Sequence, residues 1–532
     1  MSNEFLFSSK FWELLNYSFE LYPGSFIADS HVDVRLTYER FQRVSKRLSK
    51  EMENKYLNSK DIVHFIGKNS LALCACYCAV VYNDWVPVGS GSRISLSKLE
   101  RNVNSTHAKG LVISKKLWKK WGNMLESKTL NMIFVYDEIQ KDEFFDVEIR
   151  VILYDDIDVR LVYDKSKLKN TSFICMTSGS TGLPKPVMID HHLLLKTMMS
   201  VTSSFLGLLP IFQKMFILSP PFSNSGGMLT FFIGIFCGHN IVIMESFSPK
   251  LYLDTFTKYN CNYILCTSAM LIALANYSNL SDYNLNHTAS IVCGGDMINI
   301  EAMNVIKEKT KISDIVEFFQ VYGSSECPIT HFTKSDINSI EEYLDPPASA
   351  IECKIMNVST NMECAIGENG ELWIKSPSTM LGYFGDEEKT NSVLTEDGWY
   401  KTGDIAHFDQ VGKLYICGRL EEIVKFNEHT IYSEELEKVI LQHPTVKIAA
   451  VFGEHHEHGE IPIAVVERLS DVTEDELLEF VNEQVSEFKR LHQIYFVSNI
   501  RLNNGNKVDK ISLKRKVRSK PLFNVLRNLH FC

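Results

Sequence analysis

The residues of this chain best suited to chemistry form a short loop rich in glycine and hydroxyl side chains. It runs Thr177-Ser178-Gly179-Ser180-Thr181-Gly182-Leu183-Pro184-Lys185 and follows the β-prone run Ser172–Met176. Its glycines let the backbone approach a polyanion closely, and its hydroxyl and N–H groups can line an anion-binding concavity. The loop is not a Walker A sequence, because Lys185 lies three residues beyond Gly182 and no Ser or Thr follows it. A phosphate-binding loop is the favoured interpretation, and an ordinary polar loop is the alternative.

Further motifs with polar or charged side chains follow along the chain. They are Cys293-Gly294-Gly295-Asp296, Val321-Tyr322-Gly323-Ser324-Ser325-Glu326, Gly398-Trp399-Tyr400-Lys401-Thr402-Gly403-Asp404, Gly418-Arg419-Leu420-Glu421-Glu422 and Gly505-Asn506-Lys507-Val508-Asp509-Lys510. Each one alone has a simple explanation as a turn, a strand end or a solvated charge. Glu326 can nevertheless supply the carboxylate oxygen that a hard cation needs, and Asp404 is an acceptor suited to two hydroxyl groups.

Taken in order, these motifs resemble those of the adenylate-forming superfamily. That superfamily includes acyl- and aryl-CoA synthetases, firefly luciferase and the adenylation domains of peptide synthetases. The first motif is similar to the family's TSGxTGxPKG, with Pro186 in place of the last glycine. The resemblance extends from about residue 30 to 520. Any single motif could arise by chance, whereas the loop followed by five further motifs in the family's order does not.

The resemblance implies a nucleotide site. The loop from Thr177 to Gly182, with Lys185, would hold the β- and γ-phosphates of ATP. Adenine would lie beside Gly294, Gly295 and Asp296 and would stack on Tyr322, which precedes Gly323. Ser325 would contact the α-phosphate, and Glu326 would hold Mg²⁺. The ribose would be bound by Asp404 and Arg419.

The same resemblance implies residues for catalysis and for domain motion. Lys507 would reach the α-phosphate and the substrate carboxylate, where it would counter the charge that accumulates at phosphorus. Glu421 occupies the hinge position, and Lys425 lies on the segment used in thioester formation. Glu428 and Asn506 each replace a glycine of the family pattern. Adenylate formation is therefore better supported than transfer of the acyl group to coenzyme A.

A further segment bears on the choice of substrate. Pro220–Gly226 aligns with the family's PxFHxxG, so Ser223 stands where many acyl-CoA synthetases have histidine. Amino-acid-activating relatives carry an aspartate near here for the substrate ammonium, and Ser223 cannot supply that charge. An amino acid substrate is therefore disfavoured. The residues expected to line the acyl pocket are Phe222, Ser223, Gly226, Gly294 and Ser324.

The elements that must position these residues are predicted by the apolar pattern. From about residue 60 to 420, short β-prone runs such as Asp61–Ile66 and Tyr263–Cys266 alternate with helical segments such as Pro249–Tyr259. This rhythm is typical of mostly parallel sheets covered by helices. Closely spaced glycines at about residues 347–416 predict a smaller, barrel-like β unit. We therefore expect an α/β fold with a large domain, residues 1–418, and a small mobile α+β domain, residues 419–532, with the hinge near Glu421.

Composition limits the class of protein. The 532 residues carry a formal charge of −10 without a sustained basic run, which disfavours a nucleic-acid partner. The longest apolar runs, Leu71–Tyr82 and Met228–Cys237, fall short of the roughly 20 residues that span a bilayer, so we expect no transmembrane segment. Thirteen scattered cysteines without a secretory signal favour a cytoplasmic location. The C-terminus, Leu529–Cys532, is not the peroxisomal SKL signal, although a peroxisomal location stays open.

The sequence therefore predicts an enzyme that uses ATP and Mg²⁺ to convert a carboxylic acid into an acyl-adenylate and pyrophosphate. Transfer to coenzyme A would follow, which makes the enzyme an AMP-forming acid–thiol ligase. One alternative passes the acyl group to a carrier or, as luciferases do, to oxygen. Another is a weakened paralogue that binds nucleotide or an acyl ligand without turnover. The particular acid and the oligomeric state cannot be read from the sequence.

Overall fold

The computed structural model describes residues 10–92, 94–141, 144–153, 168–177, 185–190, 192–193, 195–197, 215–348, 350–426, 429–456, 459–500, 508, 510 and 513–514. The chain forms two compact units. The first contains residues 1–177, 184–351 and 375–398, and the second contains residues 178–183, 352–374 and 399–532. Most of the predicted β-rich stretch therefore belongs to the same unit as the C-terminal residues.

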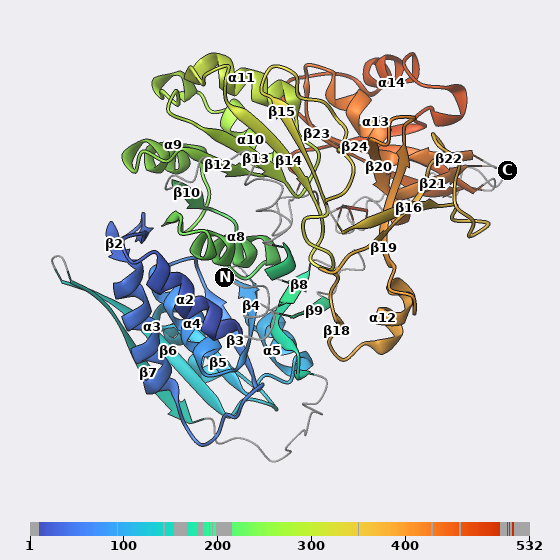
Figure 1. Cartoon of the computed structure of the whole chain (residues 1–532). Coiled ribbons are helices and arrows are strands. Elements are labelled where there is room, and N and C mark those ends of the chain that lie inside the picture. The colour runs from blue at the N-terminus through green and yellow to red at the C-terminus, as the bar shows by residue number, and fades with distance from the viewer. Residues whose placement is uncertain are drawn as a thin grey trace. The chain divides into compact units, whose positions relative to one another are not determined.

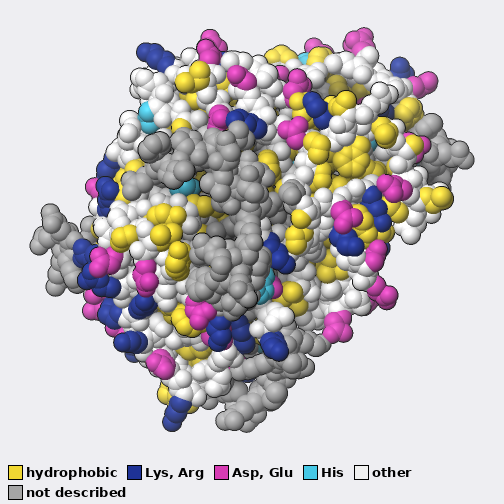
Figure 2. Space-filling model, in the orientation of Figure 1, with side chains coloured by type: hydrophobic (Ala, Val, Ile, Leu, Met, Phe, Trp, Pro, Cys, Tyr) yellow, Lys and Arg dark blue, Asp and Glu magenta, His cyan; other side chains and the backbone are white. Residues whose placement is uncertain are grey.

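Acidic and basic side chains are intermixed over the face shown in Figure 2.

The first unit contains two eight-stranded sheets. One sheet has the order β15-β14-β13-β12-β10-β11-β1-β2, in which the six inner strands are parallel and both edge strands are antiparallel. Its strands are β1 (Phe26–Asp29), β2 (Val34–Thr37), β10 (Met215–Leu218), β11 (Asn240–Ile243), β12 (Tyr263–Cys266), β13 (Ser290–Gly294), β14 (Glu317–Tyr322) and β15 (His331–Asp336).

The other sheet has the order β18-β9-β8-β4-β3-β5-β6-β7. Strands β8, β4, β3, β5 and β6 are parallel, whereas β7, β9 and β18 join antiparallel to their neighbours. The bounds are β3 (Ile62–Gly67), β4 (Val86–Gly91), β5 (Gly110–Ser114), β6 (Met132–Lys141), β7 (Phe144–Leu153), β8 (Thr171–Thr177), β9 (Lys185–Asp190) and β18 (Gly382–Tyr383).

Helices cover both faces of these sheets, as Figure 1 shows. One buried core joins the two sheets through α2 (Phe11–Leu21), α3 (Tyr38–Met52), α4 (Leu71–Tyr82) and α8 (Ser225–Phe236). The outer face of the first sheet packs against α9 (Pro249–Lys258), α10 (Ser268–Ala275) and α11 (Ile300–Thr310). The outer face of the second packs against α5 (Leu96–Ser105) and α6 (Lys115–Trp121), and α12 (Glu387–Val393) follows β18.

Local sequence explains where several helices begin. The hydroxyl of Ser70 accepts a hydrogen bond from the Leu73 N–H at the start of α4, and Thr267 caps α10 in the same way. Ser248 caps α9, whose first residue is a proline. Such caps satisfy N–H groups that have no partner inside the helix. Helix α4 is buried over eleven of its twelve residues, including its three cysteines, so it is a core helix.

The second unit contains two smaller sheets. A four-stranded sheet is formed by β16 (Glu352–Met356), β17 (Gly370–Lys375), β19 (Tyr400–Phe408) and β20 (Leu414–Arg419). A five-stranded sheet is formed by β21 (Ile423–Phe426), β22 (His429–Tyr432), β23 (Val446–His456), β24 (Gly459–Arg468) and β25 (Gln493–Val497), and its core includes α13 (Ser433–Leu441) and α14 (Glu474–Asn482).

The remaining elements among the described residues are short 3₁₀ helices: η1 (Gly122–Met124), η3 (Leu280–Asp282), η4 (Leu420–Glu422) and η5 (Glu487–Lys489). The predicted α/β class, with helix-covered and mostly parallel sheets, is confirmed. Among the helices that the structure describes, none combines the length and the apolar composition needed to cross a bilayer.

Candidate active site

The glycine-rich loop connects two antiparallel strands. Strand β8 ends at Thr177 and β9 begins at Lys185, and these two residues are register partners. The Thr177 hydroxyl donates a hydrogen bond of 3.4 Å to the Lys185 carbonyl. Ser178, Gly179, Ser180, Thr181 and Gly182 lie outside the described residues, so their predicted contacts with phosphate remain a prediction.

The turn after β14 carries the predicted metal ligand. A Cβ added to Gly323 would lie 2.4 Å from the Ile329 nitrogen, so the tight path of this turn requires glycine. The hydroxyl of Ser324 accepts a hydrogen bond of 3.1 Å from the Cys327 N–H. The hydroxyl of Ser325 lies 2.6 Å from that of Ser225. Hydrogen bonds within the turn and with Ser225 of α8 therefore hold the segment that contains Glu326.

Tyr383 connects Glu326 with Lys185. Its phenolic oxygen donates a hydrogen bond of 2.8 Å to Glu326 Oε1, and the Lys185 ammonium lies 5.6 Å from the centre of its ring. A cation at that distance is attracted to the ring. Burial and the charge of Glu326 also raise the pKa of the neighbouring Cys175 thiol to about 12, so this thiol is neutral. The first unit thus brings the predicted lysine and the predicted carboxylate to one side chain.

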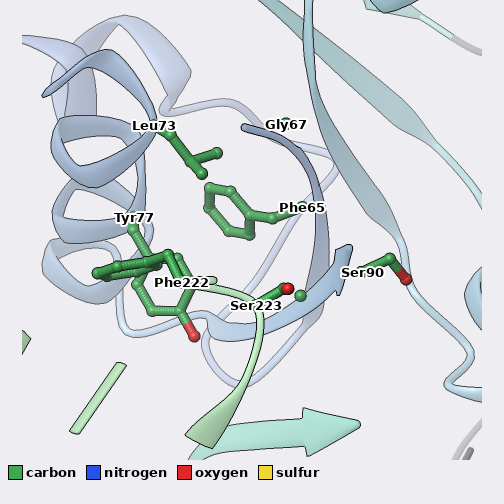
Figure 3. Close-up of a pocket in the computed structure, with 8 residues that line it drawn as sticks. Phe65, Gly67, Leu73, Tyr77, Ser90, Phe222 and Ser223 are labelled. Atoms are coloured by element: carbon green, nitrogen blue, oxygen red, sulfur yellow. The ribbon is translucent and has the colours of Figure 1, made fainter. Parts of the chain in front are cut away.

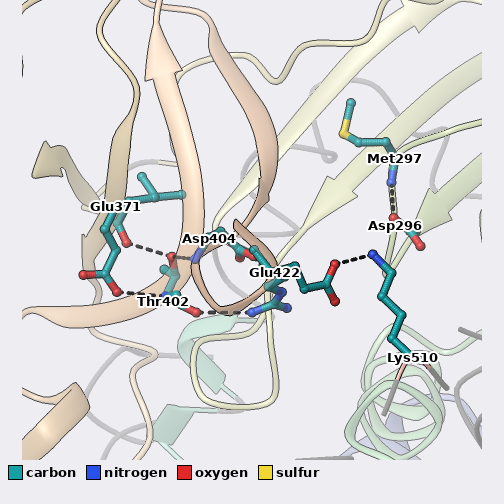
Figure 4. Close-up of polar contacts among 10 residues, drawn as sticks. Asp296, Met297, Glu371, Thr402, Asp404, Glu422 and Lys510 are labelled. Carbon is teal, nitrogen blue, oxygen red and sulfur yellow. Dashed lines mark hydrogen bonds and ion pairs between the residues drawn. The ribbon is translucent and has the colours of Figure 1, made fainter. Parts of the chain in front are cut away.

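The adenine-binding residues predicted from sequence lie at the ends of neighbouring strands. Gly294 at the end of β13 pairs with Val321 in β14, so the Gly-Gly turn and Tyr322 adjoin at the carboxyl edge of a parallel sheet. Ligands commonly bind at this edge in α/β proteins. Gly295 has φ +83°, a conformation that favours glycine, and the Asp296 carboxylate accepts a hydrogen bond of 3.0 Å from the Met297 N–H (Figure 4).

Two of the predicted acyl-pocket residues line a small cavity in the first unit, shown in Figure 3. Its volume is about 10 Å³, which is room for a single water molecule. Phe222 is only 2% exposed and packs edge-on against Tyr77 with ring centroids 4.7 Å apart. The buried Ser223 hydroxyl has no hydrogen-bond partner within the described part of the chain. By contrast, a Cβ added to Gly226 would meet open space.

This cavity is too small for an acyl chain. The roles of Phe222, Ser223, Gly226, Gly294 and Ser324 in an acyl pocket therefore remain a prediction. Phe222 also has a structural role, because its ring is part of the core that joins the two sheets.

In the second unit, the two residues predicted to bind ribose form an ion pair. Asp404 in β19 is the register partner of Arg419 in β20, and Arg419 Nε lies 2.9 Å from Asp404 Oδ1. The side chain of Asp404 is 9% exposed, and that of Arg419 is 42% exposed. Thr402 supports the pair, because its hydroxyl accepts a bond of 3.0 Å from the Asp404 N–H and its carbonyl accepts one of 3.3 Å from Arg419 (Figure 4).

The segment after this pair contains the predicted hinge. Glu421 lies exposed in η4, and Lys425 lies exposed in β21, where it pairs with Thr430. Glu428 and Lys507 lie outside the described residues. Their predicted roles therefore remain predictions.

A buried ion cluster lies close in sequence to the predicted hinge, Glu421, and to Lys507. The Lys510 ammonium contacts a Glu422 oxygen at 2.5 Å (Figure 4). It also contacts Glu437 Oε1 at 2.8 Å. Burial alone would lower the pKa of Lys510, but the charges of Glu437 and Glu422 outweigh burial and raise it. Lys510 lies three residues beyond Lys507. Its contact therefore links this part of the chain to Glu422, the residue that follows the predicted hinge Glu421.

Comparison with known sequences decides the family. Residues 21–384 match the profile described as AMP-binding enzyme, and residues 435–507 match that of the AMP-binding enzyme C-terminal domain. The chain belongs to the AMP-binding enzyme family. This confirms the resemblance to adenylate-forming enzymes that the ordered motifs indicated.

Two relatives illustrate the range of this AMP-binding family. The chain is 26% identical to 4-coumarate–CoA ligase-like 3 of Arabidopsis thaliana, over 89% of this chain and 86% of the relative. It is also 26% identical to luciferin 4-monooxygenase of Photinus pyralis, over 94% of this chain and 92% of the relative.

A solved structure shares the fold of this AMP-binding enzyme. O-succinylbenzoate coenzyme A synthetase of Bacillus subtilis, in complex with ATP and magnesium ion, superposes with a TM-score of 0.76 at 22% identity, covering 94% of this chain and 99% of that structure. At this identity, the match supports the fold alone.

The structure brings two pairs of the predicted charged residues together. Within the first unit, Lys185 and Glu326 contact one tyrosine; within the second, Asp404 and Arg419 contact each other. The loop residues and Lys507 lie outside the described part. Sequence reasoning missed Tyr383, which lies with Phe384 in an aromatic pair between Gly382 and Gly385.

Proposed function

We propose that this chain uses ATP and Mg²⁺ to activate a carboxylic acid as an acyl-adenylate and then transfers the acyl group to coenzyme A. The observation that carries the proposal is the convergence of Lys185 and Glu326 on Tyr383, because a cation and a metal-binding carboxylate are both needed where ATP phosphates lie. Membership of the AMP-binding family supports the adenylate step. The ligase-like relative supports coenzyme A as the acceptor.

The residues present fit a magnesium ion. Glu326 Oε1 accepts the Tyr383 hydrogen bond, whereas Oε2 has no partner among the residues that the structure describes. Mg²⁺ prefers oxygen ligands and commonly uses one or two carboxylates together with substrate phosphates. Glu326 would hold the ion, and the bound ion would supply positive charge to the phosphate oxygens.

The proposed reaction joins two anions. An oxygen of the substrate carboxylate attacks the α-phosphorus of ATP, a P–O bond to that oxygen forms, and the bond to the pyrophosphate leaving group breaks. No protein nucleophile is required, so the chain acts by positioning and by neutralising charge. Lys185 would neutralise charge on the pyrophosphate that leaves. Lys507 would do so at the α-phosphate and at the incoming carboxylate.

The ion pair between Asp404 and Arg419 in the second unit fits a sugar-binding role. Asp404 can accept hydrogen bonds from both ribose hydroxyls, while Arg419 holds its carboxylate in place and donates to the same sugar. The 2.9 Å contact between them holds the Asp404 carboxylate in one orientation, so little ordering of these two side chains would be needed on binding.

The acceptor of the second half-reaction has a competing assignment, because the chain is also similar to luciferin 4-monooxygenase. In the proposal, residues 419–532 turn as a mobile domain about Glu421 and present Lys425 for thioester formation. The thiolate of coenzyme A then attacks the acyl carbon, and AMP leaves. A cytoplasmic location is part of the same proposal.

The first test is isotope exchange between ATP and pyrophosphate across fatty, aryl and amino acids. Exchange with at least one fatty or aryl acid is expected, and Lys185→Met should reduce it. Lys258→Met is the matched control, because Lys258 pairs with Asp33 on the surface and should leave exchange unchanged.

The second test adds coenzyme A and measures the thioester directly. Adenylate that accumulates without thioester formation would show that another acceptor is used. Absence of exchange with every acid, in a protein that still binds ATP, would overturn the enzymatic proposal and favour a ligand-binding paralogue.

A further inference from the structure

Residues 380–384, which we call the strap, fasten two parts of the first unit together. At one end, the Met380 N–H donates a hydrogen bond of 2.7 Å to the Glu326 carbonyl. At the other, the Phe384 N–H donates one of 2.8 Å to the Pro186 carbonyl in β9. The strap therefore ties the turn that carries the carboxylate to the strand that begins with the lysine.

The strap also holds the Tyr383 side chain in one position. The Tyr383 N–H donates a hydrogen bond of 2.9 Å to the Thr390 hydroxyl, and the residue is paired with Val187 in the sheet. Only 4% of Tyr383 is exposed. Because the backbone of Tyr383 is fixed and its ring is enclosed, the fold itself directs the phenol hydroxyl at Glu326.

The hydrogen bond from Tyr383 uses one of the two carboxylate oxygens of Glu326. A phenol has one hydrogen to donate, and here it goes to Oε1 at 2.8 Å. The carboxylate cannot rotate without breaking that bond, and Oε2 is left for another partner.

We propose that Tyr383 is a positioning residue for the metal ligand, holding the Glu326 carboxylate so that Oε2 faces a divalent cation. The inference rests on the proposed function in one respect, namely that Glu326 binds the cation that accompanies ATP. It adds Tyr383, which would act through its hydrogen bond to the Glu326 carboxylate. Partners that orient a metal ligand commonly contribute a factor of roughly 10–100 to metal affinity or activity.

The test uses Tyr383→Phe, which keeps the ring beneath Lys185 and removes only the hydroxyl. Binding of Mn²⁺ is measured by electron paramagnetic resonance in the full chain, with a non-hydrolysable ATP analogue present. The variant should bind Mn²⁺ about 10–100 times more weakly. Affinity for the metal-free analogue and the unfolding temperature should stay as in the unchanged protein.

Tyr252→Phe is the matched control. Tyr252 is 1% exposed, and its hydroxyl has no hydrogen-bond partner within the described chain. This variant removes an equally buried hydroxyl far from any predicted metal ligand in sequence. Equal weakening of Mn²⁺ binding in the two variants would overturn the proposal, because the effect would then follow from any lost phenol.

A double-mutant cycle with Glu326→Gln separates positioning from a general structural effect. Glu326→Gln should weaken Mn²⁺ binding, and adding Tyr383→Phe should weaken it little further, because the hydroxyl acts through the carboxylate. Additive losses would contradict the inference. So would a Glu326→Gln variant that binds Mn²⁺ normally.

The outcome is separable from that of the proposed function. Weakened Mn²⁺ binding in Tyr383→Phe supports the inference even if no acid undergoes exchange. Unchanged Mn²⁺ binding overturns it even if adenylation is robust. Where exchange is observed, excess Mg²⁺ should restore most of the turnover of Tyr383→Phe, and a loss that Mg²⁺ does not correct would also contradict it.

Discussion

Replacing Lys510 with methionine should destabilise the second unit far more than a surface lysine replacement would. The ammonium lies between Glu422 and Glu437, and the three side chains are 19%, 30% and 14% exposed respectively. Methionine keeps most of the length of lysine and removes the charge. Two carboxylates then lie close together in a largely dehydrated position without a cation.

The magnitude follows from burial. Removing one partner of a buried ion pair typically costs about 3–5 kcal/mol. Glu422 is nearly a third exposed and regains some hydration, so we expect the lower end, about 3 kcal/mol. That loss corresponds to roughly a hundredfold increase in the equilibrium constant for opening of the unit.

The loss should also depend on pH. Burial raises the pKa of Glu437, and Lys510 opposes that rise. Without the lysine, the pKa of Glu437 rises further, so the folded state holds its proton more tightly than the unfolded state. Stability of the variant is then fully present below the ordinary glutamate pKa and is lost as pH rises through the raised value. The difference from the unchanged protein should therefore be largest near neutral pH and smaller near pH 5.

Hydrogen exchange of peptides from α13 and β23 provides the assay, since the Val451 N–H also bonds to Glu437 at 2.6 Å. Lys489→Met is the control, because Lys489 contacts Glu435 at 2.7 and 2.8 Å but with 44% of that glutamate exposed. It should cost at most about 1 kcal/mol. Equal protection losses in the two variants, or a Lys510→Met loss that does not change with pH, would refute this reasoning.

Three further outcomes are expected. Lys507→Ala should lower ATP–pyrophosphate exchange by a factor of about 100–1000 yet spare thioester formation from a supplied adenylate; equal loss of both would count against its role. Asp404→Asn should raise the KM for ATP by roughly 10–100-fold through a weakened charged hydrogen bond, and an unchanged KM would contradict the ribose assignment. Gly323→Ala should lower the unfolding temperature because its Cβ would lie 2.4 Å from a backbone nitrogen, whereas Gly226→Ala, with nothing within 4 Å, should not.

Much of the fold could be predicted because its strands are short apolar runs with a helix between them. The run Tyr263–Cys266 is β12, and Pro249–Tyr259 is α9 apart from its last residue. Strand β18 could not be found in this way, since its two residues, Gly382 and Tyr383, are too few to show alternation. Its place in the sheet depends on pairing with β9, almost two hundred residues away.

The site could be predicted where its motifs lie on two adjacent strands of one β-hairpin. Asp404 and Arg419 lie on adjacent antiparallel strands, so local register brings them into contact. The contact of Tyr383 with Glu326 spans 57 residues and has no periodic signal. For Phe222 the motif was recognised but the role was not determined, because an aromatic residue in a substrate motif can equally well be a core side chain.

The placement of β1 has a consequence for synthesis of the chain. This strand lies near the N-terminus, yet its parallel partner is β11, and the Phe26 N–H bonds to an Asn240 side chain 214 residues later. At about 5–20 residues per second, translation leaves β1 without that neighbour for roughly 10–40 s. During that interval the apolar strand Phe26–Asp29 is available to chaperones, and the first sheet can close only after β11 has left the ribosome.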